Sequence, residues 1–232
     1  MARLTDRVAL VTGAASGIGR ASAERMSADG AAIMCADIDE EGAEQTALTI
    51  EQRGGRAAHM KLDVSDEAVV KASIDDTLER LGGFDILFNN AGVGGANGWD
   101  TTISINLSGV YYGLLHGARK MAERGGGVIL NTASIAGLVG LTLGRTTPEQ
   151  ALEMADGAGA YIAAKHGVAG LTKQFAITFG TSGVRVNAIA PGYIETPMTA
   201  GLREDSVTED ALVGMHPIGR LGQPEEIAAA AA

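Results

Sequence analysis

Thr12-Gly13-Ala14-Ala15-Ser16-Gly17-Ile18-Gly19 lies between two segments of different character. Residues 7–12 form a short apolar run, and residues 16–29 repeat apolar side chains at helical spacing before stopping at Gly30. This order predicts a strand, a glycine turn and a helix. Glycines in such a turn allow a ligand to approach the backbone closely, and the free N–H groups at the start of the helix attract an anion.

An acidic residue follows the second predicted strand. Residues 31–36 are apolar, and Asp37 comes next, 18 positions after Gly19. A carboxylate at this point can accept hydrogen bonds from ribose hydroxyls, and it repels a 2′-phosphate. The glycine loop contains no Lys or Arg before Arg20, and Asp37 is followed by Ile38. We therefore expect NAD rather than NADP, with the alternative that the glycines only shape a turn.

The rest of the chain alternates short apolar segments with helical ones. Strands are expected at 56–62, 84–88, 127–132 and 185–190, and helices at 40–53, 66–81, 100–123 and from Tyr161 to about Phe179. This alternation predicts an α/β Rossmann fold, a doubly wound parallel sheet with helices on both faces. Because no linker or long repeat divides the sequence, residues 1–232 are expected to form a single dinucleotide-binding and catalytic domain.

Composition excludes several partners. The 232 residues include 18 basic and 28 acidic side chains, which gives a net charge of −10. Such acidity argues against nucleic acid and anionic membranes as partners. No apolar run is long enough for a bilayer, the start does not resemble a signal peptide, and the single Cys35 has no partner for an internal disulfide, so we expect a cytoplasmic protein. The four histidines are scattered, and no metal site is expected.

Tyr161 and Lys165 are four residues apart in a segment that reads as helix, so their side chains share one face. A tyrosine ionises near pH ~10 when unperturbed, and a nearby positive charge favours the phenolate. On its own this spacing more often marks two surface residues. Its meaning depends on the other motifs in the chain.

From residue 7 to about residue 227 the chain resembles the classical short-chain dehydrogenase/reductase (SDR) family. The motifs that carry the resemblance are Thr12 to Gly19, Asp37, Asp63-Val64, Asn89-Asn90-Ala91-Gly92, Asn106, Ser134, Tyr161 with Lys165, Asn187, Pro191-Gly192 and Thr196-Pro197-Met198. The resemblance implies an NAD(H)-dependent oxidoreductase that interconverts a small-molecule secondary alcohol and its ketone by hydride transfer. It also implies a homo-oligomer, either a dimer or the homotetramer common in the family.

The resemblance assigns four catalytic residues. Tyr161 would exchange a proton with the substrate oxygen, a general acid–base step. Lys165 would hold the nicotinamide ribose and favour the Tyr161 phenolate. Ser134 would hydrogen-bond the reacting oxygen. Asn106 would position a water that relays protons from Lys165, although a buried Asn can also simply satisfy backbone groups.

The cofactor site implied by the resemblance lies at the carboxyl ends of the strands, where open α/β sheets bind ligands. It comprises Thr12, Gly13, Ser16, Gly17, Ile18, Gly19, Asp37, Ile38, Asp63, Val64, Asn90, Ala91, Gly92, Tyr161, Lys165, Pro191, Gly192, Ile194 and Thr196.

The sequence departs from the family pattern in three places. The connection before Asn106 is shorter than usual, and the one before Tyr161 is longer, at about 141–158. In the longer connection we predict a short helix that begins near Pro148, with an apolar face of Ala151, Leu152, Met154 and Ala155. This helix either shapes the substrate pocket or is a neutral surface excursion. Family members usually continue past the Pro224 helix to a final strand, which we do not expect in this sequence.

A substrate loop is expected at about 193–215. Apolar residues near the expected pocket suggest a substrate with a hydrophobic portion: Ile135, Leu138, Val139, Leu141, Met154, Ile194 and Met198. Three alternatives stay open. The first is a 3-oxoacyl-carrier-protein reductase, although many of these enzymes prefer NADP. The second is a catalytically silent NAD-binding scaffold or sensor. The third, a hydrolase acting through Ser134, is disfavoured because no G-x-S-x-G elbow surrounds this residue.

Overall fold

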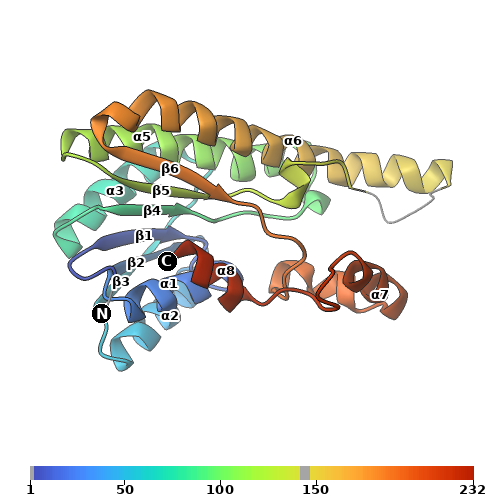
Figure 1. Ribbon diagram of the computed structural model, residues 1–232, viewed down its shortest axis with the longest axis horizontal. Coiled ribbons are helices and arrows are strands. Elements are labelled where there is room, and N and C mark those ends of the chain that lie inside the picture. Colours follow the sequence, from blue (N-terminus) through green and yellow to red (C-terminus); the bar gives the residue numbers. More distant parts are fainter. Residues whose placement is uncertain (1–2, 142–146) are drawn as a thin grey trace.

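A six-stranded parallel sheet forms the centre of the protein (Figure 1), for which a computed structural model describes residues 3–141 and 147–232, excluding the side chains of 150 and 153–157. The strands are β1 (Val8–Thr12), β2 (Ala32–Asp37), β3 (Ala57–Lys61), β4 (Ile86–Asn89), β5 (Gly127–Thr132) and β6 (Val184–Ile189). Their order in the sheet is β3-β2-β1-β4-β5-β6. The order reverses between β1 and β4, and ligands bind at such a switch point in doubly wound sheets. The predicted Rossmann fold is therefore confirmed.

Helices cover both faces of the sheet (Figure 1). One face carries α1 (Gly17–Ala28), α2 (Glu40–Gln52) and α8 (Pro224–Ala231), and α8 packs against α1. The other face carries α3 (Glu67–Leu81), α5 (Gly109–Glu123) and α6 (Pro148–Phe179). This arrangement buries a separate apolar layer on each side of one sheet, in a single domain.

Strand β1 shows why the sequences of these strands are continuous apolar runs. Ala9 and Val11 face the layer beneath α1 and α2, whereas Val8 and Leu10 face the layer beneath α3, α5 and α6. All four side chains are buried. Successive side chains of a strand point to opposite faces, so a strand covered on both sides has no solvent-facing position.

The helix that carries Tyr161 is longer than predicted. Helix α6 begins at Pro148, as expected, but it continues without a break to Phe179 over 32 residues. The prediction of a separate short helix was therefore wrong. Glycine costs a helix only about 1 kcal/mol relative to alanine, so Gly157 and Gly159 do not end it, and no proline follows Pro148 within it. Its first turns project beyond the sheet (Figure 1). The predicted apolar positions Met154 and Ala155 lie outside the described side chains.

The segment predicted as one helix at 100–123 contains an irregular turn. Helix α4 (Trp99–Ile103) passes into a π-helical turn (Ser104–Ser108) before α5 begins at Gly109. Single π-turns inside α-helices often occur at functional sites. Asn106 lies at the centre of this turn.

Short 3₁₀ segments and a further α-helix, α7, complete the fold. These are η1 (Gly95–Asn97), η3 (Ile135–Gly137), η4 (Gly180–Ser182), η5 (Pro197–Arg203) and α7 (Ser206–Gly214). The last two form most of the expected substrate loop and lie apart from the sheet (Figure 1). Within 3–141 and 147–232, no helix has the length and apolar character needed to cross a bilayer.

Candidate active site

The carboxyl ends of the strands surround a cleft of about 590 Å³. Most of the predicted cofactor residues line it, together with Ser134: Gly13, Ser16, Gly17, Ile18, Asp37, Ile38, Asp63, Val64, Asn90, Ala91, Gly92, Tyr161, Lys165, Pro191, Gly192, Ile194 and Thr196. The other predicted site residues, Thr12, Gly19 and Asn106, are buried behind its wall.

The three glycines of the first loop are each required by geometry. Gly13 and Gly17 have φ of 71° and 50°, in the left-handed region that favours glycine. A Cβ on Gly19 would lie 1.9 Å from the carbonyl oxygen of Gly13. The loop therefore brings bare backbone to the start of α1, which fits an anionic diphosphate group.

Asp37 is held at the end of β2 by backbone donors. Its Oδ2 accepts a hydrogen bond from the N–H of Ala15 (2.9 Å), and its Oδ1 accepts one from the N–H of Asp39 (3.0 Å). The next side chain, Ile38, is 61% exposed. Lys165 is the one basic side chain among the described residues that line the cleft. A carboxylate without a basic neighbour suits a free ribose better than a phosphorylated one.

Two polar side chains join the loops at the switch point. Thr12 Oγ1 accepts hydrogen bonds from the N–H groups of Asn90 (3.0 Å) and Ala91 (3.1 Å). Asn90 Nδ2 donates to the carbonyl of Thr12 (3.1 Å), and its Oδ1 accepts from the hydroxyl of Thr132 (3.1 Å). Thr12 and Asn90 therefore fix the ends of β1, β4 and β5 relative to one another.

Tyr161 and Lys165 share one face of α6, as their spacing predicted, and both line the cleft. The Lys165 nitrogen lies 5.6 Å from the centre of the Tyr161 ring and donates a hydrogen bond to the carbonyl of Thr132 (2.7 Å). Burial lowers the pKa of Lys165 to about 8. A cation that loses its water is disfavoured unless other groups replace that water.

Burial raises the pKa of Tyr161 above its ordinary value. A hydrogen bond with Ser134 partly counters this shift, and the nearby phenol of Tyr193 adds to it. Ser134 also accepts a hydrogen bond from the N–H of Ala136 (3.1 Å), which orients its hydroxyl. The arrangement can pass a proton between the Tyr161 hydroxyl and an oxygen bound beside Ser134.

Asn106 uses both ends of its amide on one residue. Its Oδ1 accepts from the N–H of Val93 (2.8 Å), and its Nδ2 donates to the carbonyl of Val93 (2.7 Å). The side chain is fully buried. Asn106 thus fixes the wall of the cleft at Val93, a backbone-satisfying role that the sequence allowed.

The substrate side of the cleft differs from the prediction in several residues. Ile135, Leu141, Ile194 and Met198 line it as expected. The predictions for Leu138 and Val139 were wrong, because these side chains are 62% and 54% exposed and do not line the cleft. The short 3₁₀ turn after Ser134 ends before them. Tyr193, Leu202 and Leu212 also line the cleft and lie within the substrate loop expected at about 193–215, whereas sequence reasoning missed Val93, Ile105 and Ala158.

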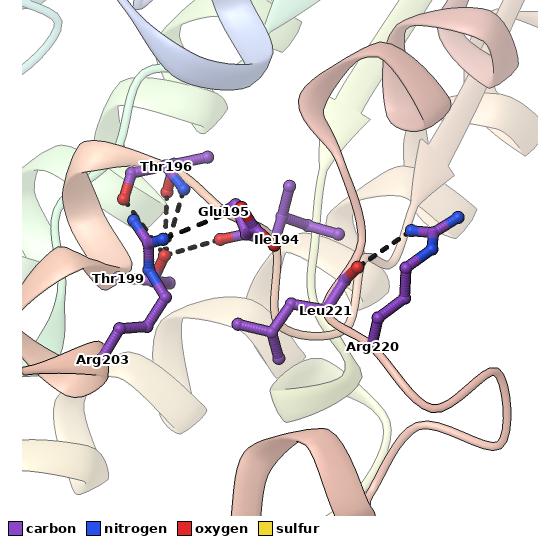
Figure 2. A network of polar contacts seen from close by, with 7 residues as sticks. All are labelled: Ile194, Glu195, Thr196, Thr199, Arg203, Arg220 and Leu221. Atoms are coloured by element: carbon purple, nitrogen blue, oxygen red, sulfur yellow. Dashed lines mark hydrogen bonds and ion pairs between the residues drawn. The ribbon is translucent and has the colours of Figure 1, made fainter. Parts of the chain in front are cut away.

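The loop after β6 is braced by its own polar groups (Figure 2). The Thr199 hydroxyl donates to the carbonyl of Ile194 (2.6 Å) and accepts from the N–H of Thr196 (3.1 Å). Glu195 faces Arg203 at 3.8 Å. On the other side, the N–H of Glu195 donates to the carbonyl of Gly222 (2.9 Å). These hydrogen bonds therefore fix the backbone of the loop that lines the cleft at Ile194, Thr196 and Thr199.

Comparison with known proteins agrees with this geometry. A family model described as enoyl-(acyl carrier protein) reductase matches residues 13–232. Cyclohexanol dehydrogenase of Acinetobacter sp. (strain SE19) is 37% identical over 97% of this chain and 86% of that protein. Cis-4-hydroxycyclohexanecarboxylate dehydrogenase of Sinomonas cyclohexanicum is 41% identical over 98% of this chain and 88% of that protein.

Solved structures are similar as well. The crystal structure of levodione reductase has a TM-score of 0.86 and 38% identity, covering 99% of this chain and 90% of that one. A protein from Agrobacterium tumefaciens assigned as a 2-deoxy-D-gluconate 3-dehydrogenase, with bound NADP, has a TM-score of 0.84 and 36% identity, covering 98% and 88%.

The cleft and these relatives together define an oxidoreductase that uses a nicotinamide cofactor. The chain belongs to the short-chain dehydrogenase/reductase family.

Proposed function

We propose that the protein is an NAD-dependent dehydrogenase that interconverts cyclic secondary alcohols and their ketones. The observation that carries the proposal is the meeting of Tyr161, Ser134 and Lys165 in one cleft with the glycine loop and Asp37. A protein that only binds dinucleotides needs no proton donor at this end of the cleft.

The bound nicotinamide would accept or supply the hydride. The loop Gly13–Gly19 would take the diphosphate at the start of α1, where bare backbone and free N–H groups meet. Asp37 would bind the adenosine ribose, and its charge is the reason we propose NAD. One similar structure holds NADP, so coenzyme preference needs a direct test.

The proton would move at the Tyr161 hydroxyl. Ser134 would hydrogen-bond the substrate oxygen and stabilise the charge that develops on it. Lys165 would bind the nicotinamide ribose, whose hydroxyls would replace water around its buried nitrogen. The Asn106 side chain, which makes both of its hydrogen bonds to Val93, would hold the wall of the cleft. A water that relays protons from Lys165 would then bind backbone groups of the π-helical turn rather than the Asn106 amide.

The substrate class is argued from the cleft and from the relatives. Ile135, Leu141, Ile194 and Met198 give the substrate end an apolar lining, which suits a hydrocarbon ring. Several relatives are dehydrogenases or reductases whose names include cyclohexanol, hydroxycyclohexanecarboxylate and cyclohexadienediol. A six-membered alicyclic alcohol is therefore the substrate we propose.

The test is turnover of cyclohexanol and related secondary alcohols with NAD⁺ and with NADP⁺. We compare wild type with Tyr161→Phe, and use Tyr112→Phe as the control because that half-buried tyrosine lies on α5 outside the cleft. We expect NAD-dependent oxidation that falls about 10²- to 10⁴-fold in Tyr161→Phe, while NAD⁺ binding persists and the control keeps wild-type rates. NAD⁺ binding without turnover of any alcohol would instead favour a silent binding protein, and equal rates in Tyr161→Phe would remove Tyr161 from the reaction.

A further inference from the structure

The cleft holds a second phenol, which comes from the loop after β6. Of the four tyrosines in the chain, Tyr161 and Tyr193 line the cleft. Tyr193 follows Pro191-Gly192 at the end of β6 and is half-buried. The two phenols are near enough that negative charge on Tyr193 would raise the pKa of Tyr161. Tyr193 therefore lines the same cleft as Tyr161 and Ser134.

His216 holds Tyr193 in place. The Tyr193 N–H donates a hydrogen bond to His216 Nε2 (3.1 Å), and the two rings meet edge to face with centres 6.0 Å apart. Because His216 Nε2 accepts this hydrogen bond, the ring proton is on Nδ1, and the Nδ1–H group donates a hydrogen bond to the carbonyl of Leu212 (2.8 Å). A Cβ on Gly192 would lie 2.7 Å from His216 Nε2, so glycine at 192 makes room for this contact.

The hydroxyl of Tyr193 makes no hydrogen bond within the described part of the chain, although the backbone and the ring of this residue are fixed. Burial also raises the pKa of Tyr193, so the group is a neutral phenol that can both donate and accept. Much of the surrounding lining is apolar, including Leu141, Ala158, Ile194, Met198 and Leu212. A polar group fixed in such surroundings gains most from a partner that the ligand brings.

We propose that Tyr193 determines specificity by binding a second oxygen function of the substrate, either a hydroxyl or a carbonyl, while the reacting oxygen lies at Tyr161 and Ser134. His216 is the positioning residue that aims it. This inference rests on the proposed function, and it narrows the substrate class to alicyclic alcohols that carry another oxygen on the ring.

Such a site discriminates between substrates that differ by one oxygen. One net hydrogen bond between neutral groups raises kcat/KM by about five- to tenfold. We therefore expect wild type to prefer a cyclohexanediol or hydroxycyclohexanone over cyclohexanol by about that ratio. An apolar pocket alone would prefer cyclohexanol.

The experiment measures the ratio of kcat/KM for cyclohexane-1,4-diol, cis and trans, to that for cyclohexanol, with NAD⁺ and the full chain. Tyr193→Phe removes only the hydroxyl, and we expect its ratio to fall to about one or below. Tyr112→Phe removes the same atom outside the cleft and keeps the wild-type ratio. His216→Leu removes the acceptor for the Tyr193 N–H and lowers the ratio through KM for the diol, whereas His216→Gln, which keeps an acceptor, restores part of it. Thermal unfolding of each variant identifies those that are folded.

The outcomes separate this inference from the proposed function. Turnover of cyclohexanol with no diol preference in wild type, or an unchanged ratio in folded Tyr193→Phe, overturns the role of Tyr193 and leaves the dehydrogenase intact. A ratio that falls in Tyr193→Phe but not in His216→Leu overturns the positioning role of His216. If wild type oxidises neither cyclic alcohol with NAD⁺, both the proposed function and this inference are overturned.

Discussion

The side-chain nitrogen of Lys165 donates a hydrogen bond to the backbone carbonyl of Thr132 over 2.7 Å, and no second hydrogen-bond acceptor for it occurs in the described part of the chain. An ammonium group has three protons to donate. Lys165 is buried, and its pKa falls to about 8 for that reason. A buried ammonium group with one hydrogen bond lowers the free energy of unfolding of the cofactor-free protein. We infer that Lys165 serves cofactor binding rather than stability.

Replacing Lys165 should therefore stabilise the cofactor-free protein. The folded pKa of about 8 is below the value near 10.4 in an unfolded chain, so the unfolded state binds more protons between these limits. The penalty is complete below pH 8 and disappears as pH rises toward about 10.5, with a size of about 3 kcal/mol at most. The lost hydrogen bond to Thr132 offsets about 1 kcal/mol. We expect Lys165→Met to raise the free energy of unfolding by about 1–2 kcal/mol at pH 7, and by less at pH 9.5.

Urea unfolding at both pH values measures this effect. Lys173→Met is the matched control, because Lys173 is exposed on the same helix, and its effect should be within about 0.5 kcal/mol. A Lys165→Met protein less stable than wild type at pH 7 would contradict the argument.

Removing the Ser134 hydroxyl should change the pH dependence of alcohol oxidation. The hydrogen bond with Ser134 lowers the pKa of Tyr161, so Ser134→Ala should raise that pKa further. Oxidation requires Tyr161 to give up its proton, so the rise of kcat/KM with pH should move to higher pH. Loss of one donor to the reacting oxygen should lower kcat by about 10²- to 10³-fold. Rates measured from pH 6 to 10.5 test this, with exposed Ser182→Ala as control. An unshifted profile in Ser134→Ala would separate Ser134 from Tyr161.

The coenzyme preference should depend on the charge of Asp37. The two oxygens of its carboxylate accept hydrogen bonds from the N–H groups of Ala15 and Asp39, so Asp37→Asn removes the charge and also one of these two acceptors, because an amide has a single oxygen. We expect Asp37→Asn to weaken NAD⁺ binding and to relieve the repulsion of NADP⁺. Adding Ile38→Arg, at a side chain that is 61% exposed, supplies a partner for the 2′-phosphate and should reverse the preference. The values of kcat/KM for both coenzymes decide this, and wild type that favours NADP⁺ would refute the assignment.

The sequence predicted those parts of the fold and site that depend on local pattern. The apolar runs and the helical spacing located the strands and helices, and Tyr161 and Lys165 share a helix face because four residues make about one turn. Contacts between residues far apart in the sequence could not be predicted from local pattern. The link between Tyr193 and His216 joins residues 23 apart across two loops, and no periodicity encodes it. Its only sequence signal was an aromatic residue directly after Pro191-Gly192.

The same limit explains the errors. Leu138 and Val139 read as pocket residues because they follow Ser134, but a 3₁₀ turn carries the chain out to solvent at that point. The insertion was predicted as a separate short helix from its start near Pro148 and the apolar residues that follow, whereas the structure joins it to α6. A glycine ends a helix only where another backbone conformation is more favourable by more than the helix loses at that position, about 1 kcal/mol. The local sequence pattern does not contain that comparison.

Glycine substitutions test the dinucleotide loop directly, because Gly19 and Gly170 are both helical but have opposite surroundings. A Cβ on Gly19 would lie 1.9 Å from the Gly13 carbonyl, so Gly19→Ala must move the loop. We expect it to lose about 1–3 kcal/mol of stability and most of its NAD⁺ affinity. On Gly170 in α6, a Cβ meets nothing within 4 Å, so Gly170→Ala should gain up to about 1 kcal/mol and bind NAD⁺ as wild type does. Calorimetric titration and urea unfolding measure both variants. Wild-type NAD⁺ affinity in Gly19→Ala would mean that the dinucleotide does not approach this loop, because the added methyl group cannot fit while the loop keeps its shape.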